Sequence, residues 1–425
     1  MRLLDWGLRR LIRRGELTII DSAGRRWSYG VPDPGRDPVV IRFTDPALPR
    51  KLVVHPPLAL GEAYMDGRVV FEAGDILGLV ELITANARWE DKQGPRSRLI
   101  DRASRMRGWL ADRNSERRAR RNSAHHYDIG NRLYELFLDR DMQYSCAYFA
   151  DAANSLDRAQ ADKKAHIAAK LCLEPDMRVL DIGCGWGGMA LYLHQASGAE
   201  VLGVTLSAEQ VKMARERAEA AGVAAKVSFK PLDYRQIEGR FDRIVSVGMF
   251  EHVGAAHYRQ FFGKCRELLA PDGIMLLHTI GRFDTPTSGD AFLDRYIFPG
   301  YHIPTLSQLL GASEDARLIT ADVETLRLHY AYTALHWLRR ARTAMAEIKE
   351  LHGERFARMW EYYLCGAVGL FEHGSGCVFQ VQYLRDRNAA PITRDYMLDE
   401  ERRLRSPSRY LRNRRAGGAS CAIGA

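Results

Sequence analysis

The spacing of apolar and polar positions becomes regular downstream of Asp176. Short apolar runs of strand length alternate there with longer stretches in which apolar residues recur at helical spacing, such as Glu209–Ala221 and His257–Leu269. The apolar runs are Arg178–Ile182, Val201–Leu206, Val227–Asp233, Arg243–Phe250 and Gly273–Ile280. Strands that alternate with helices predict a parallel sheet with right-handed crossovers. We therefore expect an α/β domain with a doubly wound, mostly parallel, Rossmann-like sheet.

The first apolar run breaks into a glycine-rich turn. Residues 181–188 read Asp-Ile-Gly-Cys-Gly-Trp-Gly-Gly, and a helical pattern begins near Met189. Such a turn lets a ligand approach the backbone and a helix N-terminus closely. The turn lacks the Gly-Lys-Ser/Thr of a phosphate loop, and Asp181 would repel a pyrophosphate. An acidic strand end suits a cationic, hydroxyl-rich ligand better, which favours S-adenosylmethionine (SAM) over a dinucleotide or a purely structural turn.

Polar side chains follow each predicted strand, and the carboxyl ends of such strands are where ligands gather. These residues are Asp181, Thr205, Ser207, Asp233, Tyr234, Glu251, His252 and His278. Taken singly, Asp233 could be a helix cap and His278 is more easily explained as a core histidine. Their joint placement favours one shared crevice. The second strand ends at Thr205, without the carboxylate that usually holds a ribose. Either Thr205, Ser207 and Gln210 make those bonds instead, or the cofactor is held differently.

The rest of the chain divides by pattern. Residues 1–95 contain short alternating runs separated by Gly and Pro, which predict a smaller α+β domain for binding or assembly. Residues 96–122 predict an arginine-rich linker helix, and residues 123–390 a catalytic domain that includes the sheet and two long helices, at Tyr332–His352 and Gly353–Phe371. Residues 391–425 predict a basic, flexible tail.

The charge of the chain favours an anionic partner. Lys and Arg number 62 against 53 Asp and Glu, a net charge of +9. Ten arginines lie between residues 96 and 121, around an apolar stripe. This segment fits a solvated helix best, then a membrane-surface contact, then a nucleic-acid contact, because arginine alone does not distinguish these phosphates. Residues 1–17 likewise fit a helix that packs on its own domain or one that rests on anionic lipid.

Two further observations concern the location of the protein. Its seven cysteines are scattered and form no Cys-x-x-Cys pair, so neither a disulfide scaffold nor a zinc site is indicated, and we expect a reducing cytoplasm. The sequence has no apolar run near the roughly 18 residues that a membrane span requires.

Several motifs together resemble the cyclopropane fatty acyl phospholipid synthases. The longest, residues 241–254, reads Phe-Asp-Arg-Ile-Val-Ser-Val-Gly-Met-Phe-Glu-His-Val-Gly. The others occur in family order at Leu58–Gly67, His126–Asn131, Gln143–Phe149, Asp181–Gly188, Thr205–Gln210, Leu277–Gly281, Tyr296–Pro299 and Tyr362–Leu364. The resemblance covers most of the chain and is weakest before about Val53 and after about Asp386. It implies the class I SAM-dependent methyltransferase fold, an N-terminal lipid-binding-type domain and, as in many members, a homodimer. We expect a cytoplasmic enzyme that works peripherally at the inner face of a membrane, where its arginines would assist contact with anionic headgroups.

The activity that the resemblance implies is transfer of a methylene group from SAM to the cis double bond of an unsaturated acyl chain in a membrane phospholipid. Carried over by motif, SAM would be held by Tyr144, Ser145, Asp181, Gly183, Gly185, Trp186, Gly187, Gly188, Thr205, Ser207, Gln210, Asp233 and Tyr234. A bicarbonate ion would lie among Cys146, Glu251, His278, Ile280 and Tyr330. Of these, Glu251, His278, Tyr330 and Cys146 would be catalytic.

One position departs from the family. Some members carry a cysteine, once proposed as active, where this chain has Ala367, two residues after Cys365. Either Cys365 substitutes for it or, as we expect, no nucleophilic cysteine is required. An alkene is a weak nucleophile with no proton to lose beforehand, so a covalent residue would contribute little, and alignment and exclusion of water matter more. Methyl transfer would leave a carbocation, which aromatic faces could stabilise. A base such as bicarbonate would then remove a proton to close the ring.

Three rival functions remain at this stage. An enzyme with the same fold and cofactor could produce a methyl- or methylene-branched chain. A nucleic-acid amine methyltransferase usually presents Asn-Pro-Pro-Tyr after the fourth strand, where residues 248–251 here read Gly-Met-Phe-Glu, so we expect no nucleic-acid partner. A non-catalytic lipid-binding protein could also retain a cofactor pocket.

Overall fold

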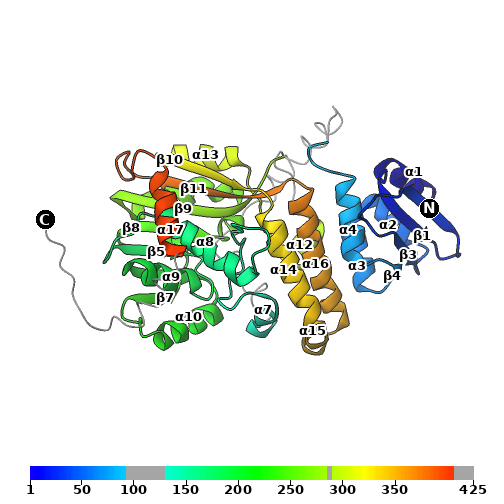
Figure 1. Ribbon diagram of the computed structural model, residues 1–425, viewed down its shortest axis with the longest axis horizontal. Coiled ribbons are helices and arrows are strands. Elements are labelled where there is room, and N and C mark those ends of the chain that lie inside the picture. Colours follow the sequence, from blue (N-terminus) through cyan, green and yellow to red (C-terminus); the bar gives the residue numbers. More distant parts are fainter. Residues whose placement is uncertain (92–129, 285–289, 406–425) are drawn as a thin grey trace.

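A computed structural model describes residues 1–91, 130–284 and 290–405. Its centre is a seven-stranded sheet in the order β10-β11-β9-β8-β5-β6-β7 (Figure 1). The strands are β5 (Arg178–Ile182), β6 (Glu200–Thr205), β7 (Val227–Pro231), β8 (Phe241–Val247), β9 (Leu269–Arg282), β10 (Ile319–Leu326) and β11 (Gly376–Leu384). Strands β5 to β9 are parallel to their neighbours among themselves, which confirms the predicted mostly parallel α/β sheet.

The sequence pattern did not predict the last two strands. Strand β11 pairs antiparallel with both β9 and β10, so the sheet gains an antiparallel edge. Every residue of β11 is buried. Because three helices separate β10 from β11 along the chain, the strand–helix alternation that revealed the first five strands does not extend to this pair.

Helices cover both faces of this sheet. They are α8 (Leu156–Lys170), α9 (Gly188–Ser197), α10 (Ala208–Ala220), α11 (Tyr258–Leu268) and α13 (Leu306–Asp315). Helix α8 begins at Ser155, whose hydroxyl accepts from the Arg158 N–H, a standard N-cap. Most of α8 is buried, including Lys163 and Lys170. Helix α8 therefore lies inside the domain, although it has the composition of a surface helix.

The chain after residue 391 differs from the flexible tail predicted from its basic composition. Residues 395–405 form helix α17 (Asp395–Arg405), which packs along α8. Met397 and Glu401 are buried, and Arg405 forms ion pairs with Asp162 and Glu401. Spacing of four residues places these three side chains on one face of α17, and their contacts hold the helix in place. Residues 406–425 of the predicted tail lie outside the described residues.

The N-terminal residues form a separate four-stranded sheet in the order β2-β1-β3-β4. Its strands are β1 (Gly15–Ile20), β2 (Arg26–Val31), β3 (Val39–Phe43) and β4 (Val69–Ala73), and its helices are α1 (Arg2–Leu11), α2 (Leu48–Val54), α3 (Pro56–Met65) and α4 (Ile76–Ala85). This composition matches the expected α+β module. The predicted linker, residues 96–122, lies outside the described residues.

Three helices lie between the module and the seven-stranded sheet (Figure 1). They are α14 (His329–Thr343), α15 (Met345–His352) and α16 (Glu354–Glu372), so the helix predicted at Tyr332–His352 is divided into two at Ala344. Helix α16 packs against α3 and α4. A Cβ on Gly61 of α3 would lie 2.7 Å from the Tyr362 ring of α16, so the missing side chain permits the close approach of the two helices. One continuous hydrophobic cluster includes residues of both parts.

Two hydrogen bonds fasten this contact. The Tyr64 hydroxyl donates to Glu361 Oε2 at 2.6 Å, and the Tyr362 hydroxyl donates to the Pro57 carbonyl at 2.9 Å. Along the described ranges of the chain, the structure has no helix long and apolar enough to cross a membrane.

Candidate active site

The glycine-rich turn follows β5 and leads into α9. Gly183, Gly185 and Gly187 have φ values of +85°, +53° and +82°, in the region that favours glycine. A Cβ on Gly183 would lie 2.6 Å from Met249 Cβ, and a Cβ on Gly187 would lie 2.7 Å from the Phe229 ring. A side chain would fit beside Gly185, where a Cβ would meet no protein atom within 4 Å. The turn thus brings the backbone against β7 and the loop after β8.

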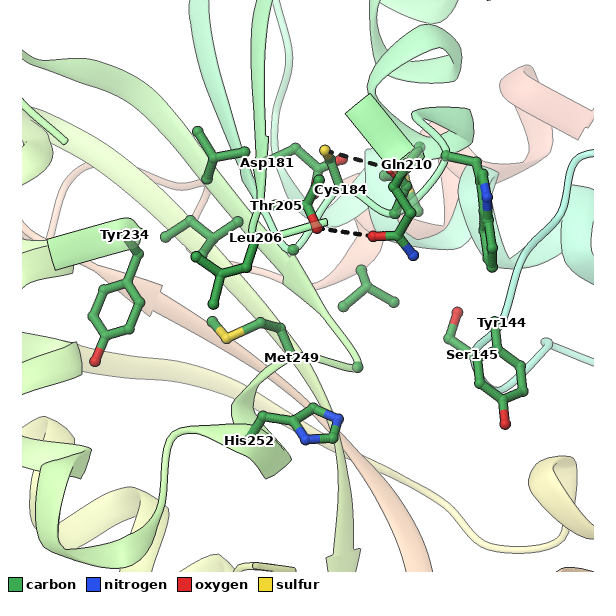
Figure 2. Close-up of a pocket in the computed structure, with 18 of the residues that line it drawn as sticks. Tyr144, Ser145, Asp181, Cys184, Thr205, Leu206, Gln210, Tyr234, Met249 and His252 are labelled. Carbon is green, nitrogen blue, oxygen red and sulfur yellow. Dashed lines mark hydrogen bonds between the residues drawn. The ribbon is translucent and has the colours of Figure 1, made fainter. Parts of the chain in front are cut away.

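A cavity opens beside this turn, at the carboxyl ends of β5, β6, β7 and β8 (Figure 2). Ten of the residues predicted to hold SAM line this cofactor cavity: Tyr144, Ser145, Asp181, Gly183, Gly185, Trp186, Thr205, Gln210, Asp233 and Tyr234. Figure 2 shows Tyr144 and Ser145 across the cavity from Asp181 and Thr205, with Met249 and His252 along a third side. The cavity is therefore bounded by strand ends and by the segment before α8.

Three predicted cofactor residues contribute to the framework and do not line the cavity. Gly187 is the N-cap of α9. A Cβ on Gly188 would lie 2.4 Å from Gln143 Nε2, so this glycine admits the Gln143 side chain. The Ser207 hydroxyl accepts from the Gln210 N–H at 3.3 Å and caps α10. Gln210 is thereby oriented so that its Oε1 accepts from the Thr205 hydroxyl at 2.8 Å.

Asp181 has an unusual environment for a carboxylate. It is 1% exposed, and its Oδ2 has no hydrogen-bond partner among the described residues. Burial raises the pKa of Asp181 to about 7, although the positive charge of Lys163 opposes this shift. A buried acceptor without a partner, at the edge of a cavity, suits a ligand that carries hydrogen-bond donors or positive charge.

Lys163 is a site residue that the sequence did not reveal. Its Nζ donates to Gln143 Oε1 at 2.7 Å and to Ser145 Oγ at 2.8 Å, and both of these residues line the cavity. Burial lowers the pKa of Lys163 to about 8. Helix α8 has charged residues throughout, so no apolar stripe distinguished its buried lysines from solvated ones.

Other residues that line the cavity were not individually assigned to SAM, although the sequence pattern indicated pocket-forming segments around residues 142–149 and 294–304. Among them are Met142, Gln143, Met249, Arg235, Phe298, Pro299 and Gly300. The Arg235 guanidinium forms an ion pair with Asp233 at 2.6 Å, which holds that carboxylate at the cavity wall. His252, expected at a strand end, also lines the cavity, and burial lowers its pKa to about 4. Phe298 to Gly300 come from an aromatic, turn-rich segment, so that composition was the available signal.

Glu251 lies on the short 3-10 helix η2 (Phe250–His252), after β8, and is 4% exposed. Its Oε1 accepts from the Ile280 N–H at 2.5 Å, and its Oε2 has no hydrogen-bond partner in the described structure. The nearby Thr279 hydroxyl donates to the Ile280 carbonyl at 3.1 Å. Burial raises the pKa of Glu251 to about 7, which makes its proton exchangeable near neutral pH.

His278 lies two residues before Ile280 on β9, on the same face of the strand. Its Nδ1 is 3.1 Å from Gln380 Nε2 on β11, and Gln380 Oε1 accepts from Lys170 Nζ at 2.8 Å. We call Glu251, Ile280, His278, Gln380 and Lys170 the β9 cluster. None of these residues lines the cofactor cavity.

Cys146 and Tyr330 belong to the large hydrophobic cluster against which Ile280 packs. Cys146 Sγ donates to the Ala147 carbonyl at 3.3 Å, and the Ala147 N–H donates to the hydroxyl of Thr333, one turn after Tyr330 on α14. Burial raises the pKa of the Cys146 thiol far above its usual range. Tyr330 stacks on Phe371 with ring centroids 4.3 Å apart. Cys146 therefore remains a neutral thiol, and it is not an activated nucleophile.

Comparison with known proteins identifies relatives over most of the chain. Residues 114–381 match the family model described as mycolic acid cyclopropane synthetase. The cyclopropane-fatty-acyl-phospholipid synthase of Escherichia coli K12 is 38% identical over 363 residues, which are 84% of this chain and 90% of that protein. A probable fatty acid methyltransferase of Pseudomonas putida is 38% identical over 389 residues, 87% of this chain and 94% of that protein.

A solved structure shows the same fold. It is the mycolic acid cyclopropane synthase CmaA1 complexed with SAH and CTAB, which is 29% identical and superposes with a TM-score of 0.60. The superposition covers 62% of this chain and 98% of that one.

Proposed function

Because this chain belongs to the mycolic acid cyclopropane synthetase family and is a SAM-dependent methyltransferase, we propose that it is a cyclopropane-fatty-acyl-phospholipid synthase. The reaction would transfer a methylene group from SAM to the cis double bond of an unsaturated phospholipid acyl chain. The observation that carries this proposal is the β9 cluster. This cluster contains a buried carboxyl group with a pKa of about 7, Glu251, and a buried histidine, His278. Both lie near strand ends of the seven-stranded sheet.

The cofactor cavity fits SAM, and the related structure with SAH supports this assignment. Asp181 Oδ2 is a buried acceptor without a partner, which suits a donor-bearing, cationic ligand. Thr205 and Gln210 would hold the ribose side, and Tyr144 with Ser145 would close the opposite wall (Figure 2). Bound there, SAM supplies an electrophilic methyl group. The role of the protein is to align an acyl double bond with that group and to exclude water.

Residues around β9 would handle the proton. Once the acyl chain carries a cation, one hydrogen of the transferred carbon must leave for the ring to close. A buried carboxyl group that titrates near pH 7 can accept it, and Glu251 is such a group. The faces of Phe149 and Tyr330, both buried, could stabilise the cation. Burial of this region keeps water from capturing the cation and producing an alcohol.

Bicarbonate fits part of this donor set. Tyr330 and His278 each have a hydrogen to donate, and a protonated Glu251 would add one more, whereas the Cys146 thiol donates to the Ala147 carbonyl and would have to turn away from it. The Ile280 N–H, which the family resemblance assigns to bicarbonate, here donates to Glu251 Oε1. It would reach an anion only if that carboxyl group turned aside. If bound, bicarbonate would supply a second base beside Glu251.

The test is to incubate the purified protein with SAM and vesicles of cis-unsaturated phospholipid. We expect an acyl product about 14 mass units heavier, and proton NMR of the product should show cyclopropane methylene signals at high field. Failure to convert any cis-unsaturated phospholipid, with SAM binding intact, would refute the synthase assignment. That result would instead support a non-catalytic lipid-binding protein.

A second candidate is a methyltransferase that leaves a methyl- or methylene-branched chain. The relative in Pseudomonas putida is named a probable fatty acid methyltransferase, and its similarity to this chain is as high as that of the cyclopropane synthase. From the same methylated cation, loss of a methyl proton with ring closure gives the cyclopropane, and loss of a proton from the adjacent chain carbon gives a methyl-branched alkene. A 1,2-hydride shift followed by loss of a methyl proton gives the methylene branch, and a saturated methyl branch would additionally require a hydride donor. Vinyl or branched-methyl signals in the product spectrum would select this candidate.

Membrane contact and dimer formation are parts of the same proposal. Helix α1 exposes Leu3 and Trp6, at 74% and 59%, beside several arginines, which suits an anionic lipid surface. Sedimentation with anionic vesicles should therefore weaken as salt rises. A homodimer, proposed from the family, would be tested by analytical ultracentrifugation.

A further inference from the structure

A chain of hydrogen bonds leads from His278 to a buried lysine. His278 on β9 and Gln380 on β11 are paired directly across the antiparallel strands. Gln380 Nε2 lies 3.1 Å from His278 Nδ1, and Gln380 Oε1 accepts from Lys170 Nζ at 2.8 Å. His278, Gln380 and Lys170 are 2%, 0% and 2% exposed. Solvent therefore does not compete for these bonds.

Lys170 determines which way the Gln380 amide faces. An ammonium group has only hydrogens to offer, so the oxygen of Gln380 must face Lys170 and the NH2 group must face His278. This removes the ambiguity that otherwise surrounds amide orientation. Lys170 is itself held in place, because Nζ also donates to Glu324 and its backbone carbonyl accepts from Gln382 Nε2 at 2.6 Å.

The amide in turn determines the state of the imidazole. Since the NH2 group can only donate, His278 Nδ1 must offer a lone pair, and the hydrogen of the neutral ring must be on Nε2. A proton on Nδ1 would set two donors against each other. Burial holds the pKa of His278 well below its usual range. Lys163, Lys170 and His166 also oppose protonation of the ring, whereas Glu324 favours it.

We propose that Lys170 and Gln380 are positioning residues that fix His278 as a neutral imidazole with its hydrogen on Nε2. His278 then donates a hydrogen bond during the reaction and does not act as the base. The catalytic consequence rests on the proposed function, whereas the tautomer does not. Proton removal is left to Glu251, or to an anion beside it.

The tautomer can be read directly by NMR on protein labelled with 15N-histidine. The His278 signals are identified by their loss in His278→Gln. We expect a protonated Nε2 and a bare Nδ1 in the wild-type protein at pH 7. Gln380→Glu replaces the donor with an acceptor of the same shape and should move the hydrogen to Nδ1. A wrong histidine tautomer lowers kcat by up to about 10⁴-fold in a serine protease, so we expect a loss of at least ~100-fold here.

Three further variants separate this mechanism from a general loss of structure. Lys170→Met frees the amide to rotate and should give a mixture of tautomers. Lys170→Arg keeps an obligate donor and should retain the Nε2 hydrogen. Tyr383→Phe removes a buried polar group from the opposite face of β11, where the Tyr383 ring packs on Phe262 with ring centroids 5.2 Å apart, and should leave the His278 signals unchanged. SAM affinity should remain within about threefold for all of them.

The outcomes distinguish this proposal from the proposed function. A hydrogen on Nδ1 in the wild-type protein, or an unchanged pattern in Gln380→Glu, would overturn the assignment even if the lipid product forms. A hydrogen on Nε2 without any lipid product would uphold the assignment and refute only the synthase function.

Discussion

The cofactor cavity and the β9 cluster lie at strand ends of the same sheet, but they are built in different ways. The cavity is made largely of backbone turns and short loops that follow consecutive parallel strands. The β9 cluster depends on side chains from α8, η2, β9 and β11, and the hydrogen bonds of Gln380 to Lys170 and His278 join segments more than 100 residues apart. The proposed SAM site is therefore formed mainly by local backbone structure. The proposed site of proton removal depends on contacts between distant parts of the chain.

The largest expected effect comes from Glu251→Gln, which keeps the shape of the side chain and removes its acid. Product formation should fall by about 10³-fold, within the range of general-base contributions, because no carboxyl group remains to accept the proton. SAM affinity, measured by calorimetry, should change by less than about threefold because Glu251 does not line the cavity. An equal loss of affinity would show that the two regions are a single site.

A second comparison lies within the glycine turn. Gly183→Ala would place a Cβ 2.6 Å from Met249 Cβ at a positive φ, and we expect a loss of roughly 2 kcal/mol in the free energy of unfolding. Gly185→Ala meets no protein atom within 4 Å, so about 1 kcal/mol is expected there. Both glycines line the cavity, but the new methyl group of Gly183→Ala would meet Met249, whereas that of Gly185→Ala would meet no protein atom, so the Gly185 variant should lose about tenfold in SAM affinity. Urea unfolding would measure the loss of stability, and calorimetry would measure the loss of SAM affinity. The prediction would be contradicted if the two variants lost stability and affinity to the same extent.

The sequence predicted many residues of the cavity, but it did not predict Gln380 and Lys170 of the β9 cluster. The different ways in which the two regions are built explain this difference. Asp181, Thr205 and Asp233 follow apolar runs whose alternation with helices is visible along the chain, so their convergence could be predicted from topology. Gln380 lies on a strand that is apolar at most positions but comes after three helices, outside that alternation. Lys170 lies on a helix whose charged residues resemble a solvated surface. Burial of such side chains depends on tertiary packing, which the local pattern does not contain.

The cavity should also release a proton when SAM binds. The pKa of Asp181 is about 7 in the ligand-free protein, so at pH 6.5 much of this carboxyl group is protonated. A cationic ligand beside it favours the ionised form and lowers the pKa. Calorimetry in two buffers with different ionisation enthalpies should detect this release at pH 6.5 and little at pH 8.5. Asp181→Asn should abolish it, and release that persists in this variant would assign the proton to another group.

The same raised pKa values set the pH dependence of stability. A carboxyl group whose pKa is higher in the folded state binds more protons there than in the unfolded chain, so its contribution to stability falls as pH rises. For Asp181 and Glu251 this loss extends from the ordinary pKa values of these groups, 3.8 and 4.5, up to about 7. In the ligand-free protein, Asp181→Asn should therefore flatten the fall of the melting temperature between pH 5 and 7.

The smallest expected effect tests the far end of α8. Glu401 of α17 is 6% exposed, and its Oε2 lies 3.1 Å from Nδ1 of His166, whose Nε2 is 2.6 Å from Glu324. Glu401→Gln should cost about 1 to 2 kcal/mol of stability, since it removes the carboxylate charge from the buried contacts with His166 and Arg405. Glu324 also holds Lys170, so turnover should fall about twofold while SAM binding is unchanged.

The matched control is Glu400→Gln, at the neighbouring residue. Glu400 pairs with Arg403 on a more exposed face, so this substitution should change neither stability nor turnover. If the two variants behave alike, α17 does not support the β9 cluster through His166.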